Sequence, residues 1–138
     1  MKKLLPFILI FALLEACSSG TEKPDTQALA ELAEIQFEED VYDFGTVPPQ
    51  GKVTHVFTFT NTSENPLVIS KAKASCGCTV PSYPEEPVDP GDTGEIELTY
   101  NAASTPGEIS KTITIVANTY PAKTILTIKG TIKPWFKT

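Results

Sequence analysis

The sequence contains no arginine, and its 11 basic residues are all lysine. Arginine is the side chain that most often recognises phosphate and guanine through two parallel hydrogen bonds. The lysines are outnumbered by 17 acidic residues, which gives a formal net charge of -6. Nucleic acid repels such a chain, as do anionic lipid headgroups. We therefore expect no nucleic-acid partner.

Histidine, methionine and tryptophan each occur only once. A hydrolase or transferase needs a general base beside a nucleophile, usually oriented by a third group. The one histidine, His55, falls within a predicted strand, and the sequence has no glycine-rich loop for binding phosphate. The sequence thus predicts a protein that is not an enzyme and that holds no cofactor.

Long apolar runs are also scarce, and the one that occurs covers residues 4–14 after two lysines. It is too short to cross a bilayer comfortably, and its layout is that of a secretory signal. The residues Leu14, Glu15, Ala16 and Cys17 that follow resemble the lipobox of bacterial lipoproteins, although glutamate is unusual at its position. The resemblance implies cleavage before Cys17 and lipidation of that cysteine; a plain signal peptide, cut elsewhere, is the alternative.

A lipidated Cys17 implies contact with a membrane through the lipid anchor, because several acyl chains hold a soluble domain firmly at a bilayer. The chain is then an exported bacterial lipoprotein of the cell envelope. Ser18 and Ser19 lack the aspartate that commonly retains lipoproteins at the inner membrane. This favours the outer membrane, facing the periplasm, with the cell surface as the alternative.

The length of 138 residues leaves room for one globular domain. We divide the chain into a signal peptide at 1–16, a lipidated flexible tether at 17–34 and a β-sandwich domain at 35–138. The tether starts with small polar residues that have nothing to bury. Its last part, residues 28–34, consists of helix formers, and both a short helix and a fraying turn remain open there.

From Ile35 onward, short β-type runs alternate with turn signals. In residues 52–61, hydrophobic residues and His55 fall on one face and threonines on the other, which is the period of a half-buried strand. About seven such strands predict an all-β, immunoglobulin-like β-sandwich, with an open barrel as the alternative. Residues 81–94 are predicted to form a proline-rich loop. The residues expected to face inward are Val53, Phe57, Phe59, Ile96, Leu98, Tyr100, Ile109, Ile113, Ile115, Ala117, Leu126, Ile128 and Ile132.

Three further residues have expected structural roles. Asn61 is expected to satisfy backbone groups where its strand ends, as asparagine does at turns. Trp135 and Phe136 are expected to cap the sandwich, with contact to a partner as the alternative.

Six segments carry a resemblance to a known family: DFGTV, HVFTFTNTSENPLVIS, SCGCTVP, VDPGDTGEIELTYN, GEISKTITIVANT and LTIKGTI. In this order they resemble the bacterial domain of unknown function 1573, which is related to the immunoglobulin-like domains of the Hydin and major sperm protein type. The resemblance covers about residues 37–132. It implies an immunoglobulin-like sandwich in an exported, often lipidated protein, and it implies no reaction.

Cys76 and Cys78 are separated by one glycine. In an extended strand their Cα atoms would lie about 6.6 Å apart, near the upper limit for a disulfide, so a bond requires the chain to buckle at Gly77. Three interpretations remain open. They are a disulfide, a pair of reduced thiols packed at the edge of the core, and a metal site.

A metal site built on the two cysteines would need further ligands, and His55 is the only candidate outside the pair. A structural imidazole bonded to the backbone is the other interpretation of His55. The leading functional hypothesis is a non-catalytic, membrane-tethered module that binds or supports an envelope protein or polymer. The alternative is a thiol redox or metal-handling envelope protein that uses the Cys-Gly-Cys motif.

Overall fold

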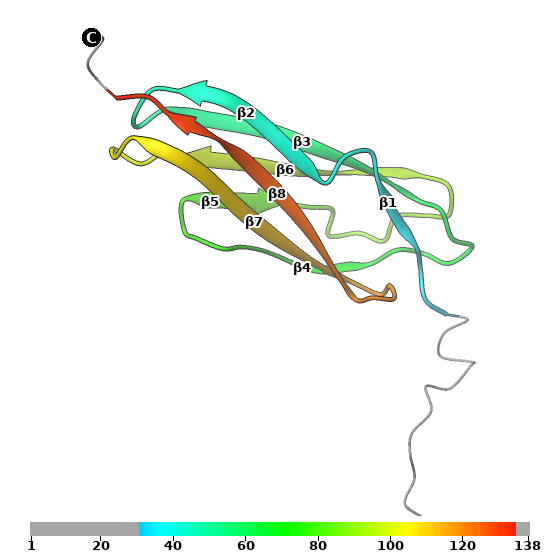
Figure 1. Cartoon of the computed structure of the whole chain (residues 1–138). Coiled ribbons are helices and arrows are strands. Elements are labelled where there is room, and N and C mark those ends of the chain that lie inside the picture. Colours follow the sequence, from blue (N-terminus) through cyan, green and yellow to red (C-terminus); the bar gives the residue numbers. More distant parts are fainter. Residues whose placement is uncertain (1–30, 135–138) are drawn as a thin grey trace, which may run out of the picture.

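The computed structural model describes residues 31–134 and shows in them two sheets of four strands each, packed face to face (Figure 1). The first sheet has the order β1-β3-β6-β5 and the second has the order β2-β8-β7-β4. Strands β2 and β8 pair in parallel, and every other pair is antiparallel. The strands are β1 (Ile35–Phe37), β2 (Val41–Val47), β3 (Lys52–Asn61), β4 (Ile69–Ala74), β5 (Thr79–Ser82), β6 (Thr93–Asn101), β7 (Gly107–Ala117) and β8 (Lys123–Ile132).

The core lies between the sheets and follows the alternation seen in the sequence. Phe57 and Phe59 of β3 are fully buried, and His55 of the same face is half-buried. The inward positions of the four long strands form one hydrophobic cluster, which confirms the predicted sandwich and its inner faces. The buried members from β6, β7 and β8 are Ile96, Leu98, Tyr100, Ile113, Ile115, Ala117, Leu126, Ile128 and Ile132.

The described residues form eight strands, and the one that the sequence pattern missed is β5. Only its last two residues fall in the predicted proline-rich loop, and its Pro81 argues against a strand. β5 is an edge strand that pairs only with β6. A proline is tolerated at a sheet edge because no neighbour needs its N–H.

Asn61 ends β3 and lies fully buried among backbone groups. Its Nδ2 donates to the carbonyl oxygens of Asn65 (2.8 Å) and Val88 (2.9 Å). Its Oδ1 accepts from the backbone N–H (3.1 Å) and the hydroxyl (2.7 Å) of Ser63. The side chain therefore joins the end of β3 to two loops, as the sequence predicts for this position.

Gly94 allows a close approach between β6 and β3. The ring of Phe59 lies so near its Cα that an added Cβ would overlap three ring carbons. Gly94 is the register partner of Phe59, and the Phe59 ring is fully buried. Any side chain at this position therefore competes with a core aromatic for the same space.

Several predictions concern residues outside the described part of the chain. These are the signal peptide, lipidation of Cys17, most of the tether, and the roles of Trp135 and Phe136. Residues 31–34 are described and are not helical. Ala33 is buried and bridges to Thr119, with its N–H donating to the Asn118 carbonyl at 2.8 Å. Within residues 31–134 no helix has the length and hydropathy needed to cross a membrane.

Candidate functional site

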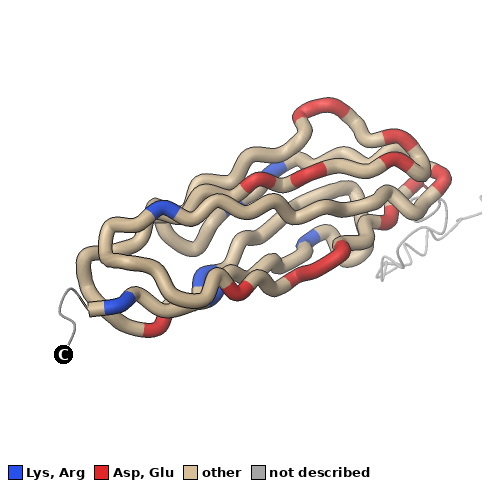
Figure 2. Tube along the Cα trace, turned by 90° about the horizontal axis from the view of Figure 1, so that it is seen from above, with Lys and Arg blue, Asp and Glu red and all other residues tan. Residues whose placement is uncertain are grey.

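One end of the sandwich, which we call the acidic pole, is formed by residues 31–34 and the loops 62–68, 83–92 and 118–122 (Figure 1). Hydrogen bonds connect these segments, including one from the Asn118 N–H to the Val68 carbonyl at 3.1 Å. Figure 2 shows most of the Asp and Glu positions, in red, toward this end of the tube. The segments contain seven acidic residues and no lysine: Glu31, Glu34, Glu64, Glu85, Glu86, Asp89 and Asp92.

The opposite end, which we call the disulfide pole, is formed by the loops 48–51, 75–78 and 102–106 (Figure 1). These three loops contain no charged residue. The loops 48–51 and 102–106 are joined by backbone hydrogen bonds from Gln50 to the Ala103 carbonyl (3.2 Å) and from Ala102 to the Gly51 carbonyl (2.8 Å). The two poles therefore differ in charge. The acidic pole carries seven carboxylates, whereas the loops of the disulfide pole are neutral and are bordered by the exposed Lys52, Glu108 and Lys133.

At the disulfide pole, Cys76 and Cys78 form a disulfide in the connection that carries the chain from β4 to β5. Their Cα atoms are 5.3 Å apart, which is closer than two such positions in an extended strand. The turn is anchored on both sides. The Ser75 N–H donates to the Thr112 carbonyl (2.8 Å), and the Asn101 N–H donates to the Cys78 carbonyl (2.8 Å).

The two sulfurs have different surroundings. Both cysteines are partly exposed, but only Cys78 packs against the hydrophobic core. The Sγ of Cys76 lies 3.8 Å from the hydroxyl of Thr79. A disulfide sulfur carries no hydrogen, so Thr79 is the donor in this contact.

Neighbouring residues of the pole are held in defined positions. Gln50 has a φ of 59°, which side chains other than glycine rarely adopt. Its side-chain amide donates to the Ser104 hydroxyl at 3.3 Å. Burial raises the pKa of the Tyr100 phenol, and a backbone hydrogen bond with Ala103 opposes this rise.

Replacing Cys76 and Cys78 together by alanine is expected to lower the free energy of unfolding by about 2 kcal/mol or less. The ring that the disulfide closes is very small, so it restricts the unfolded chain little. Urea denaturation followed by circular dichroism measures the change, and the wild-type domain in dithiothreitol is the control. A variant that loses its β-sheet signal would show that the bond holds the fold together.

His55 lies in β3, which is separated from β5 by β6 in the first sheet. Side chains from β3, from β2 and from the β1–β2 connection contact its ring. Its Nε2 lies 2.7 Å from the Glu39 carboxylate, and its ring stacks on Tyr42 with centroids 3.5 Å apart. The ring of Phe57 lies almost perpendicular to the same ring, with centroids 4.7 Å apart. The sequence predicted a backbone partner for a structural imidazole, and the structure has a carboxylate instead because the β1–β2 connection brings Glu39 alongside β3.

The structure does not bring the candidate metal ligands together. Cys76 and Cys78 are bonded to each other, while His55 pairs with Glu39. Between residues 31 and 134, no three His, Cys, Asp or Glu side chains are grouped so that they could hold a metal ion. His55 and the two cysteines therefore do not make a joint site in this structure.

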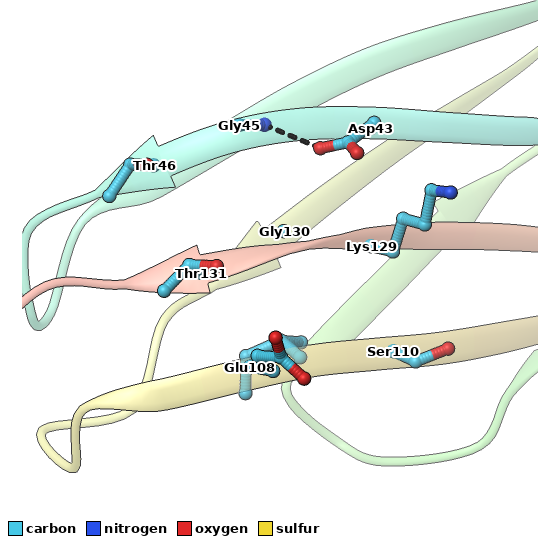
Figure 3. A pocket seen from close by; sticks show the side chains of 9 residues that line it. Asp43, Gly45, Thr46, Glu108, Ser110, Lys129, Gly130 and Thr131 are labelled. Atoms are coloured by element: carbon cyan, nitrogen blue, oxygen red, sulfur yellow. Dashed lines mark hydrogen bonds between the residues drawn. The ribbon is translucent and has the colours of Figure 1, made fainter.

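A shallow groove lies on the outer face of the second sheet, where β2, β8 and the start of β7 run side by side (Figure 3). Gly45 bends β2 with a φ of 68°, and its N–H donates a hydrogen bond to the Asp43 carboxylate at 2.8 Å. The groove carries both signs of charge and reaches toward the disulfide pole. Its lining is Asp43, Gly45, Thr46, Glu108, Ile109, Ser110, Lys129, Gly130 and Thr131.

Comparison with protein families gives one match. The model of a family described as "Protein of unknown function (DUF1573)" matches residues 35–132. This range includes both sheets and the disulfide. No curated protein matches the sequence.

Solved structures with the same fold come from bacteria and from human. A protein of unknown function from Porphyromonas gingivalis W83 has a TM-score of 0.65 at 12% identity, over 75% of this chain and 49% of that one. The chain thus spans about half the length of that protein. The ASH/PapD-like domain 7 of human CEP192 has a TM-score of 0.56 at 11% identity, over 95% of this chain and 100% of that one.

The Escherichia coli chaperone DraB has a TM-score of 0.52 at 11% identity, over 75% of this chain and 56% of that one. At these identities the likeness extends to the fold alone. The described domain is therefore an immunoglobulin-like, PapD-like β-sandwich.

Proposed function

From the premise that this chain belongs to the DUF1573 family of proteins of unknown function, we propose that it is a non-catalytic, membrane-tethered binding module of the bacterial cell envelope. Its partner is an envelope protein or polymer that contacts the disulfide pole. Cys17 carries the lipid anchor, and the domain faces the periplasm from the outer membrane.

The contrast between the two poles supports this proposal. The first described residues lie at the acidic pole, so a tether that precedes them leaves the domain from that end. Its seven carboxylates are repelled by anionic headgroups, and the domain stands away from the lipid surface. The neutral disulfide pole then points away from the membrane, where a partner can reach it.

The composition of the disulfide pole fits contact with another macromolecule. Interface centres are poor in charged residues, because a charge loses its hydration when it is covered. The loops 48–51, 75–78 and 102–106 expose small or uncharged side chains on a rigid sandwich. Binding therefore requires little desolvation of charge and little ordering of loops.

The tether is tested by replacing Cys17 with alanine. The wild-type protein is expected to incorporate labelled palmitate and to remain in the membrane fraction, whereas the variant does neither. Several acyl chains are needed for stable anchoring, so their loss releases the domain. Unlabelled wild-type protein in the soluble fraction would contradict the tether.

The contact surface is tested by site-specific photocrosslinking in living cells. Benzoylphenylalanine replaces Thr105 at the disulfide pole, and a matched variant carries it in place of Glu86 at the acidic pole. Both positions are exposed in loops. We expect one defined adduct from position 105 and none from position 86; adducts of equal yield from both, or from position 86 alone, would contradict the proposed pole.

A further inference from the structure

The Cys76–Cys78 disulfide has features that a purely structural bond does not need. It closes a very small ring, so it contributes little by restricting the unfolded chain. It lies partly exposed in a turn at the neutral pole. Gly77, between the two cysteines, is exposed, and apart from these two neighbours no residue has an atom within 4 Å of the place where a Cβ would stand. An incoming group therefore has room beside the bond.

The surroundings of the two cysteines also differ, as they do in reactive thiol pairs, where one sulfur is favoured as a thiolate and the other as a thiol. Cys78 packs against the core, where a thiol is favoured over a charged thiolate. Cys76 is not among the residues that pack there, and the Thr79 hydroxyl lies beside its sulfur at 3.8 Å. A hydroxyl stabilises a thiolate more strongly than a neutral disulfide sulfur, because a bond to an ionised acceptor is stronger. In the reduced pair, the surroundings thus favour the thiolate form of Cys76 and the thiol form of Cys78.

The flanks of the turn remain fixed when the bond opens. The Ser75 N–H and the Ser75 hydroxyl are both bonded to the backbone of Thr112, at 2.8 and 3.2 Å. The Cys78 carbonyl accepts from Asn101 on the other side. These bonds keep the two sulfurs near each other in the reduced state, so the disulfide can form again.

We propose that Cys76 and Cys78 form a reversible redox site whose reductant is an exported protein dithiol of the thioredoxin type, and that the mixed disulfide forms on Cys76. This goes beyond the binding role proposed above and does not depend on it. Thr79 acts as a positioning residue for the Cys76 sulfur.

The reaction balances in two steps. A thiolate of the partner attacks Cys76 Sγ; the bond to Cys78 breaks, and its electron pair stays on Cys78 Sγ, which takes up a proton. The second thiolate of the partner then attacks the partner's own sulfur in the mixed disulfide and releases Cys76 as a thiolate. The partner dithiol is oxidised to a disulfide, and the Cys76–Cys78 bond is reduced to two thiols. The reverse sequence oxidises the pair again.

The first experiment measures the reactivity of each cysteine in the folded domain. Dithiothreitol is expected to reduce the bond without denaturant, and limiting iodoacetamide followed by peptide mass mapping is expected to label Cys76 about tenfold faster than Cys78. A bond that dithiothreitol reduces only after unfolding, or faster labelling of Cys78, would overturn the proposal.

The role of Thr79 is tested with two variants. Thr79→Val removes the hydroxyl at similar volume, and Thr79→Ser retains it. We expect Thr79→Val to shift the pH midpoint of Cys76 labelling upward and Thr79→Ser to restore the wild-type midpoint. Equal pH midpoints of Cys76 labelling in the folded wild-type and Thr79→Val proteins would show that Thr79 has no positioning role for the Cys76 sulfur.

Trapping identifies the attacked sulfur. A thioredoxin whose resolving cysteine is replaced by alanine is mixed with the oxidised domain, and the adduct is digested and mapped. Cys76 is expected to carry the linkage in the wild-type domain. As a further check, Cys78→Ala activated with dithionitrobenzoate should couple to the thioredoxin at least tenfold faster than activated Cys76→Ala. A linkage on Cys78, or equal coupling, would overturn the assignment, whereas the photocrosslinking result would be unaffected.

Discussion

Replacing Asn61 by alanine is expected to lower the free energy of unfolding by about 3 kcal/mol. The change leaves the Asn65 and Val88 carbonyls without the donor that now lies 2.8 and 2.9 Å from them. The side chain is fully buried. The Asn65 carbonyl keeps the Ser63 hydroxyl as a donor (3.0 Å), and the Val88 carbonyl keeps the Leu67 N–H (2.9 Å). The loss therefore comes from the four hydrogen bonds of the Asn61 side chain, two as donor and two as acceptor, at about 0.5–1.5 kcal/mol each. Urea denaturation at neutral pH measures the difference.

Asn101 provides the matched control for this substitution. It also ends a strand, β6, but its side chain is exposed. We expect Asn101→Ala to change the free energy of unfolding by about 0.5 kcal/mol or less. Equal losses in the two variants would show that the Asn61 hydrogen bonds do not determine the effect.

Replacing Gly94 by alanine is expected to lower the free energy of unfolding by about 2–3 kcal/mol. The added methyl group overlaps the ring of Phe59, which is fully buried and has no free space to enter. Overpacking of a core forces side chains from their rotamers or shifts the backbone, and it costs about this much. The midpoint of urea denaturation is the measurement.

Gly77→Ala serves as the control, because an added Cβ at that position meets no atom within 4 Å from any residue other than the two flanking cysteines. Its expected effect is below about 1 kcal/mol. A second control tests the cause directly. Phe59→Leu replaces the overlapping ring by a shorter side chain. The double variant Gly94→Ala/Phe59→Leu should therefore lose less free energy of unfolding than the two single variants together, by at least about 1 kcal/mol. Additive losses would contradict a direct clash.

Much of the sandwich can be predicted from the sequence because its long strands are buried on one side only. The alternation in β3, β6, β7 and β8 is the direct result of one face meeting the core and the other meeting water. The role of Asn61 was predicted for the same reason, since it follows the last inward-facing residue of β3 at a turn. The alternation of the strands and the role of Asn61 both depend on residues that are close together in the sequence, so a local sequence pattern is sufficient to predict them.

Features that depend on tertiary structure were missed or left open. Pro81 concealed β5, because the sequence does not show that its strand lies at an edge. The partner of His55 is Glu39, 16 residues earlier, and only the β1–β2 connection brings it close. The state of Cys76 and Cys78 stayed open because the extended spacing lies near the limit for a bond, and the turn that shortens it to 5.3 Å comes from the switch between sheets.

The poles could not be predicted for a related reason. Their loops are separate in the sequence, and each one alone has an ordinary composition. Only the strand order places the four segments of the acidic pole at one end and the three loops of the disulfide pole at the other. The charge difference between the two ends is therefore a property of topology and not of any motif.

The parallel pairing of β2 with β8 has a consequence for when the domain can fold during synthesis. β2 has no other neighbour in its sheet, and β8 is the last strand of the described domain. A polypeptide that emerges N-terminus first cannot complete the second sheet until β8 has left the ribosome. Such long-range pairing delays closure. The segments from β2 to β7 therefore wait for β8 before the core between the two sheets can close.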